Sequence, residues 1–267
     1  MFGMVFASSL WNKLFTSFRE NIMLGMKQMT AILAGVGLLA SGSAQATLFD
    51  RSGGLIYDDV LNITWLQDAN YAKTSGYDAD GLMNWSAANA WAAGLSYYDS
   101  VRKVTWTGWR LPTVSPVGAA FNYRFSNNGT TDVGYGITSP NSEMAYMYYV
   151  NLGNLGYCTP DNGSPGACAM QSGWRLHHTG PFDNLQSDYY WSGTAYAPVP
   201  AHDAWTFGTL YGNQINDFQN DQLFAWAVRP GDVAAAEATP EPMSLALLGV
   251  GLGAVALVRR RRPLGAS

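Results

Sequence analysis

Charged side chains are scarce in this sequence, and their scarcity narrows the classes of function that it supports. Asp, Glu, Lys and Arg together make up 13% of the 267 residues, which carry a formal net charge of −4. Between Thr47 and Asp232 there are 8 basic and 16 acidic residues, a balance of −8. Because nucleic-acid binding requires a basic surface, this acidic segment argues against a nucleic-acid partner.

Residues and motifs that carry common enzyme chemistry are also few. The sequence has three histidines, His177, His178 and His202, and no G-x-S-x-G, phosphate-binding loop or H-E-x-x-H motif. The adjacent His177 and His178 would point to opposite faces of a strand, which makes a poor metal pair. We interpret all three as surface residues and expect no enzymatic activity. A secreted enzyme with acidic and histidine residues in one cleft, or a purely structural matrix protein, are the alternatives.

There are only two cysteines, Cys158 and Cys168, and residues 159–166 between them are all turn formers. In an exported protein we expect them to form a disulfide, which would stabilise the fold by about 3 kcal/mol in the chain-entropy model. Two free thiols or a metal pair are the alternatives, although no nearby histidine completes a zinc site.

Residues 1–46 are typical of a signal peptide. A short basic segment begins at Met26, an apolar run follows from 30 to 40, and Ala44-Gln45-Ala46 fits a cleavage site before Thr47. A buried helix is the alternative. Residues 1–25 are a long extension before this basic segment. A start codon assigned too far upstream would explain the extension, with Met26 or Met23 as the true start.

The other end of the sequence contains three features in order. A linker over 234–242 includes a Pro-Glu-Pro triplet, an apolar segment follows over 243–258, and a basic tail occupies 259–267. As a helix the apolar segment would span about 24 Å, less than the roughly 30 Å of a bilayer core. The arginines place the tail in the cytoplasm and the domain outside. The residues that define this pattern are Pro240, Glu241, Pro242, Arg259, Arg260, Arg261 and Arg262.

This arrangement resembles the PEP-CTERM sorting signal of Gram-negative bacteria. The resemblance implies export by the Sec machinery, a transient span of the inner membrane, and recognition by an exosortase near the Pro-Glu-Pro. It also implies a final place at the cell surface or in the extracellular matrix, and a link to exopolysaccharide and biofilm. A plain single-span anchor is the alternative.

Between these ends, residues 47–233 form one domain that we assign to the α+β class, with two helices early and a strand cluster late. The central stretch is Trp106–Thr113, where Trp109 and Leu111 alternate with Arg110 before a proline. Phe224–Pro230 repeats the order aromatic, arginine, proline. We predict two core strands here, with Arg110 and Arg229 bound to carboxylates or carbonyls at strand ends.

Capping signals predict the two helices. Asn84 or Ser86 begins a helix that runs to about Leu95 and turns Trp91 inward. Ser139, with proline at the next position, begins a second helix that Gly153 closes. The second helix buries a face formed by Met144, Tyr148 and Leu152.

The later segments are interpreted as strands and loops. Strands are expected over 189–194 and 204–210, a tight turn at Gly212-Asn213, and loops over Phe121–Ile137 and Gly212–Gln222.

Five motifs in order resemble the Lcl C-terminal-type domain of secreted bacterial proteins, over about Tyr57 to Asp232. They are Asp58–Gln67, Met83-Asn84-Trp85 with Trp91-Ala92, Gly108–Thr113, Tyr190–Gly193 and Ala225–Pro230. The resemblance implies a C-type-lectin-like fold, related to the formylglycine-generating enzymes, with a late twisted antiparallel sheet. The formylglycine-generating relatives use a pair of active-site cysteines, and the ten-residue separation of Cys158 and Cys168 puts that chemistry in doubt.

The lectin-like resemblance also implies a ligand site on a late loop. Asp217 and Asp221 are candidate calcium ligands, as are Asp78 and Asp80 on an earlier loop, although neither segment has calcium-loop spacing. Solvated turn residues are the alternative interpretation. We expect a non-enzymatic module that binds extracellular polysaccharide, neutral or bridged by calcium. Its candidate glycan contacts are Tyr211, Asn213, Asn216, Asp217, Phe218, Asn220 and Asp221.

Overall fold

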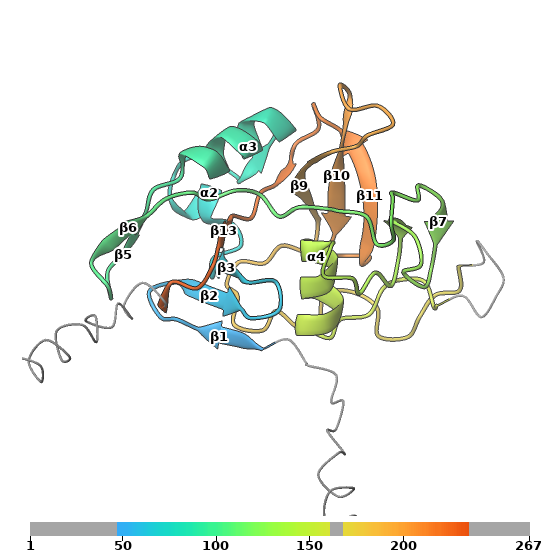
Figure 1. Ribbon diagram of the computed structural model, residues 1–267, viewed down its shortest axis with the longest axis horizontal. Helices are drawn as coiled ribbons and strands as arrows, with labels where there is room; N and C mark the ends of the chain where they lie inside the picture. The colour runs from blue at the N-terminus through green and yellow to red at the C-terminus, as the bar shows by residue number, and fades with distance from the viewer. Residues whose placement is uncertain (1–46, 161–167, 235–267) are drawn as a thin grey trace, which may run out of the picture. The chain divides into compact units, whose positions relative to one another are not determined.

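The computed structural model describes residues 47–160 and 168–234. The predicted signal peptide, the Pro-Glu-Pro triplet, the apolar sorting segment and the arginine cluster lie outside these ranges. Within them, no helix is both long and apolar enough to cross a membrane. The described part is a mixed α and β domain, mainly sheet with a few short helices (Figure 1).

Three sheets make up most of the domain. The first has four strands in the order β1 (Leu48–Asp50), β2 (Leu55–Asp58), β3 (Ile63–Leu66) and β13 (Val228–Pro230). The second has seven, in the order β4 (Leu82–Met83), β12 (Leu223–Phe224), β9 (Tyr189–Ala195), β10 (Asp203–Gly208), β11 (Asn213–Phe218), β8 (Val133–Gly134) and β7 (Phe125–Ser126). The third is a separate pair, β5 (Tyr97–Asp99) and β6 (Val104–Trp106).

The helices are short and lie beside the sheets. They are α2 (Tyr71–Thr74), α3 (Trp85–Gly94), α4 (Glu143–Tyr146) and the π-helical turn η1 (Met147–Asn151). In Figure 1, α4 lies between the first sheet and the β9–β11 part of the second, while α3 lies above β13.

The first predicted helix is confirmed as α3. The Asn84 side chain accepts a hydrogen bond from the Ala87 amide at 2.9 Å, which is the predicted N-cap, and Trp91 is buried. The helix ends at Gly94, one residue before the predicted end. Its start and end could be predicted because the cap and the apolar positions are contiguous in the sequence.

The second predicted helix begins later than expected. Ser139 and Pro140 form a turn, in which the Ser142 amide donates to the Ser139 carbonyl at 3.1 Å, and α4 starts only at Glu143. The prediction of Ser139 as N-cap is therefore wrong, because its hydroxyl caps this turn by accepting from the Asn141 amide. The predicted apolar face is confirmed, since Met144, Tyr148 and Leu152 are all buried.

The two motifs predicted as core strands are only partly strands. Trp109 and Leu111 are buried, but Arg110 makes a single bridge to Val228 in place of a full ladder. The 224–230 motif is divided into β12 and β13, which belong to different sheets. Tertiary packing therefore replaces the continuous strand that the alternation predicts.

The arginines of these motifs have different partners. Arg110 binds the carboxylate of Glu143 and the carbonyl of Leu111, as predicted. Arg229 lies over the Trp106 ring, with its guanidinium carbon 4.4 Å from the ring centroid. The prediction of a carboxylate or carbonyl partner for Arg229 is therefore wrong: an aromatic face takes that place, and burial lowers the pKa of this guanidinium.

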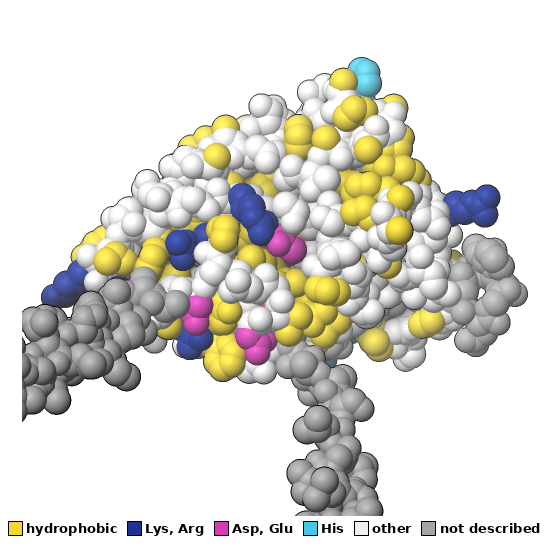
Figure 2. Space-filling model, viewed as in Figure 1, with side chains coloured by type: hydrophobic (Ala, Val, Ile, Leu, Met, Phe, Trp, Pro, Cys, Tyr) yellow, Lys and Arg dark blue, Asp and Glu magenta, His cyan; other side chains and the backbone are white. Residues whose placement is uncertain are grey.

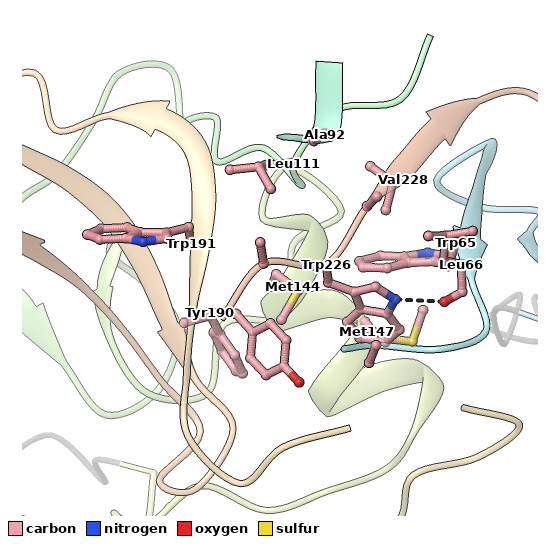
Figure 3. Packing of buried hydrophobic residues seen from close by; sticks show 14 of the residues in the cluster. Trp65, Leu66, Ala92, Leu111, Met144, Met147, Tyr190, Trp191, Trp226 and Val228 are labelled. Atoms are coloured by element: carbon pink, nitrogen blue, oxygen red, sulfur yellow. Dashed lines mark hydrogen bonds between the residues drawn. The ribbon is translucent and has the colours of Figure 1, made fainter. Parts of the chain in front are cut away.

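The core lies where the two larger sheets meet, and tryptophans dominate it (Figure 3). The rings of Trp65 and Trp226 are 4.5 Å apart between centroids, and Phe182 meets Trp226 edge-on at 4.6 Å. The Trp226 indole donates to the Leu66 carbonyl at 2.7 Å. Burial of such large aromatic side chains contributes much of the stability of a domain with short helices.

Candidate functional site

The antiparallel hairpin β10–β11 is the scaffold of the candidate site. Six residues of β10 pair with six of β11, from Asp203 with Phe218 to Gly208 with Asn213. Gly212 has a φ of +76°, and an added Cβ there would lie 2.9 Å from the Gly156 Cα, so glycine is required at this turn. The tight turn predicted from the sequence is confirmed.

The predicted loop over Gly212–Gln222 is largely a strand. Residues 213–218 form β11, and only the segment after Phe218 turns, with the Asp221 amide donating to the Phe218 carbonyl at 2.8 Å. The prediction of a loop fails because Asn and Asp favour turns locally, whereas β10 offers this segment a complete ladder of backbone hydrogen bonds.

This strand separates the predicted glycan contacts into two groups. Tyr211 and Asn213 lie at the hairpin tip, while Asn216, Asp217, Phe218, Asn220 and Asp221 lie at or beyond its other end. The five steps from Asn213 to Phe218 correspond to ~17 Å along a strand. The structure therefore brings together the second group and places the first group elsewhere.

At this other end, a buried carboxylate and an amide lie on one face of the hairpin. The Asn216 side-chain amide donates to Asp203 Oδ2 at 2.6 Å. The Asp203 residue is only 7% exposed. Its second carboxylate oxygen, Oδ1, is buried and has no hydrogen-bond partner among the described residues. An unpaired buried acceptor of this kind costs free energy in the folded state.

Aromatic rings cover the same face. The Trp205 ring is fully buried, with Phe121 stacked at 5.7 Å, Tyr123 stacked at 6.2 Å and Tyr196 edge-on at 4.9 Å between centroids. Tyr123 remains 37% exposed. Figure 2 shows hydrophobic side chains gathered over this part of the β10–β11 hairpin. We call Phe121, Tyr123, Tyr196 and Trp205 the aromatic wall.

The aromatic wall depends on a segment that the sequence predicted as a surface loop, Phe121–Ile137. Asp132 in this segment is fully buried, and its carboxylate accepts from the Val117 amide at 2.7 Å and the Asn122 amide at 2.6 Å. Its carbonyl accepts from Gln214 of β11 at 2.9 Å. The segment is thereby fixed against the sheet, and the loop prediction is corrected.

Asp217 and Asp221 form a carboxylate pair at the same end of the hairpin, but Asp217 pairs with Ala204 and so lies on the opposite face from Asn216 and Trp205. Burial, together with a hydrogen bond and charge repulsion from Asp221, raises the pKa of Asp217 to about 6. Below that pH Asp217 is protonated. Phe218, next along the strand, is 64% exposed.

Calcium does not fit these residues well. Within residues 47–160 and 168–234, no three His, Cys, Asp or Glu side chains lie close enough to hold a metal ion, whereas calcium takes six to eight oxygens. Asp78 Oδ1 accepts from the Gly81 amide at 2.8 Å, and these backbone hydrogen bonds lower the pKa of Asp78. Asp80 accepts from the Leu82 amide at 3.0 Å. The carboxylates of Asp78 and Asp80 therefore accept hydrogen bonds from backbone amides of their own turn. Asp217 and Asp221 together would supply only two carboxylate ligands.

The hairpin tip carries a second aromatic group. The Tyr211 and Trp174 rings are parallel within 5°, with centroids 5.6 Å apart, and Tyr157 meets Trp174 edge-on at 4.8 Å. Asn213, predicted as a glycan contact, is buried and its amide donates to the Tyr189 hydroxyl at 3.1 Å. Asn213 therefore holds the turn instead of facing a ligand.

The predicted disulfide is present between Cys158 and Cys168, with a sequence separation of 10. It lies beside the tip, since the Tyr157 amide donates to the Tyr211 carbonyl at 2.7 Å. All three histidines are exposed, as predicted.

Sequence reasoning missed Asp203 and the four residues of the aromatic wall. Trp205 and Tyr123 are 82 positions apart, so no local pattern joins them. Phe121 and Tyr123, two aromatic residues at alternate positions, were the signal in the sequence that could have indicated the aromatic wall.

No protein-family model, no curated protein and no solved structure matches this chain.

Proposed function

We propose that this chain is an exported, non-enzymatic protein that binds extracellular polysaccharide through the face formed by Asp203, Asn216 and the aromatic wall. The observation that carries the proposal is the exposed Tyr123 ring, which stacks on Trp205 on the same face of the hairpin as Asn216 and Asp203. Aromatic faces stack on sugar rings, while carboxylate and amide oxygens accept hydrogen bonds from hydroxyls. We also propose that the fold of the domain is C-type-lectin-like.

A neutral sugar suits this face best. Its ring would stack on Tyr123 or Phe218, and its hydroxyls would bond to Asn216 on the same face. The Asp217–Asp221 pair lies at the same end of the hairpin. At neutral pH Asp217 is largely ionised, because its pKa is about 6. The carboxylates would then repel an acidic polysaccharide at this end of the hairpin unless a cation lies between them.

The location proposed is the cell surface or extracellular matrix of a Gram-negative bacterium. Its support is the sequence order of signal peptide, Pro-Glu-Pro triplet, apolar segment and arginine cluster, which resembles exosortase sorting after Sec export. The disulfide between Cys158 and Cys168 suits an oxidising compartment. The link to exopolysaccharide and biofilm follows from the same resemblance.

An enzyme on this scaffold is the alternative, and the Asp217–Asp221 pair is its best candidate centre. Retaining glycosidases hold their two carboxyl groups about 5 Å apart, and inverting enzymes hold them farther apart. Asp217 and Asp221 are instead hydrogen-bonded to one another. This closeness favours the binding interpretation.

The experiment compares the parent with Tyr123→Ala/Phe218→Ala in affinity electrophoresis through gels that contain neutral polysaccharides. We expect retardation of the parent and at least a tenfold weaker affinity for the double variant. Tyr77→Ala/Tyr98→Ala is the matched control, because both tyrosines are exposed and lie on other parts of the fold. Equal retardation of all three proteins, or none for the parent, would reject the proposal.

A further inference from the structure

The hairpin tip carries an arginine in an unusual backbone conformation. Arg175 has a φ of +104°, a left-handed value that a non-glycine residue adopts only under strain. Bridges from Leu155 to both Trp174 and Arg175 hold the segment in this conformation. Strain of this kind is often kept where it places a side chain for binding.

The strained backbone directs Arg175 to the aromatic group of the tip. Its guanidinium carbon lies 4.6 Å from the centroid of the Trp174 ring, and Trp174 stacks in turn on Tyr211. Arg175 is exposed, and none of the ion pairs found in the described part of the chain involves it. Its charge is thus presented to solvent beside two parallel rings.

The aromatic rings are themselves fixed. The Tyr157 amide donates to the Tyr211 carbonyl at 2.7 Å, and the Gln171 amide donates to the Tyr157 carbonyl at 2.8 Å. The neighbouring disulfide joins Cys158 to Cys168 and so links the segments that carry Tyr157 and Gln171. Tyr157 packs edge-on against both Trp174 and Tyr211. A ligand would therefore meet a surface that needs little rearrangement, which lowers the entropic cost of binding.

We infer that Trp174, Tyr211 and Arg175 form a subsite for a sugar that carries a carboxylate, such as a uronate residue of an acidic polysaccharide. The sugar ring lies against Trp174 and Tyr211, and its carboxylate accepts two hydrogen bonds from the guanidinium. In a domain whose balance is −8, an arginine that forms no ion pair with the carboxylates of the described residues is the feature that selects an anion.

This inference extends the proposed polysaccharide binding, and it concerns a different place. The tip lies ~17 Å along β11 from the Asn216 end, so one extended polysaccharide chain can contact both. Two linked contacts raise the overall affinity above that of either one. The neutral and acidic preferences of the two ends would then select a polymer that contains both kinds of sugar.

The test uses the full chain in detergent, with EDTA present, and an oligogalacturonide as the probe. The same oligomer in its methyl-esterified form is the neutral comparison. We expect the parent to bind the free acid more tightly than the ester. Arg175→Gln should lower affinity for the acid about tenfold and leave the ester unchanged, while Lys73→Gln, an exposed lysine on α2, should change neither.

A second variant separates binding from folding. Arg175→Gly relieves the left-handed backbone, so it should raise Tm while it removes the preference for the acid. A loss of stability would instead mark Arg175 as a structural residue and overturn the inference.

The two proposals can fail separately. If Arg175→Gln binds the acid like the parent while Tyr123→Ala/Phe218→Ala loses neutral polysaccharide, only the subsite is wrong. If the Arg175 effect persists and the neutral polysaccharide never binds, the proposal for the Asn216 end is wrong. A parent that binds neither form of the oligomer rejects the subsite.

Discussion

The carboxylate of Glu143 binds the guanidinium of Arg110 through two hydrogen bonds, of 2.7 Å and 2.8 Å, and it also accepts from the Thr113 amide at 2.7 Å. This contact ties the central tryptophan-rich segment to the start of α4. The side chain of Glu143 is only 11% exposed, so the pair is partly shielded from water.

We predict that Glu143→Gln lowers the free energy of unfolding by about 2 kcal/mol, because it leaves a charged donor without its anion. Urea unfolding at pH 7 measures the change. Asp232→Asn is the matched control: Asp232 also binds an arginine, Arg51, but its side chain is 18% exposed, against 11% for Glu143. That control should lose less than about 1 kcal/mol. Equal losses in the two variants would contradict the importance of the Glu143 contact.

The Arg110 contact shows which part of the fold was predictable. The sequence indicated that this arginine is structural, because it lies between large apolar residues near a proline. It did not identify Glu143, which is 33 positions away and was expected inside a helix that began at Ser139. Local chemistry such as the Asn84 cap could be predicted, whereas partners set by tertiary packing could not.

The indole donors of Trp65 and Trp226 give a second prediction. Both rings are buried in the same cluster, but Trp226 donates to the Leu66 carbonyl, while Trp65 Nε1 has no partner in the described residues. Trp226→Phe should therefore cost about 1–2 kcal/mol more than Trp65→Phe, because only the first leaves a buried carbonyl unpaired. Chemical denaturation of the two variants, which lose the same ring volume, checks the difference. A larger loss for Trp65→Phe would refute this account.

The disulfide gives a third prediction. Cys158→Ser/Cys168→Ser should lower the free energy of unfolding by about 3 kcal/mol, since the bond closes a short loop in the unfolded chain. The parent in reducing agent should show the same loss, and Ellman's reagent should find no thiol in the unreduced, denatured parent. Two titrating thiols in that sample would show that the bond does not form.

The candidate site was less predictable than the fold, and Asn216 illustrates why. Its segment, Asn213–Phe218, has the composition of a turn, and only the ladder from β10 makes it a strand. The amide was correctly selected as a polar group, but its partner Asp203 and the ring of Tyr123 come from segments distant in sequence. A site that combines two paired strands with the distant segment around Tyr123 has no fixed sequence spacing that a motif could reveal.

The Asp217–Asp221 pair gives the last prediction, which concerns pH. Burial and the neighbouring Asp221 raise the pKa of Asp217 to about 6 in the folded state, above the usual value of about 4. Between these values the folded protein holds a proton that the unfolded chain has lost, so the free energy of unfolding falls as pH rises. Above pH 6 both states are ionised, and the destabilisation stays constant.

Asp217→Asn removes the ionising group and keeps a hydrogen-bonding side chain. It should therefore be more stable than the parent at pH 7.5, by about 1 kcal/mol because water screens a partly exposed pair. Near pH 2.5 the two proteins should be equally stable, since Asp217 is then protonated in both states. Urea unfolding at both values measures this, and Asp59→Asn, an exposed aspartate in the turn after β2, controls for the loss of one negative charge. A stability difference that does not change with pH would mean that Asp217 has the same pKa in the folded and unfolded states, and Asp217 would then act as an independent surface charge.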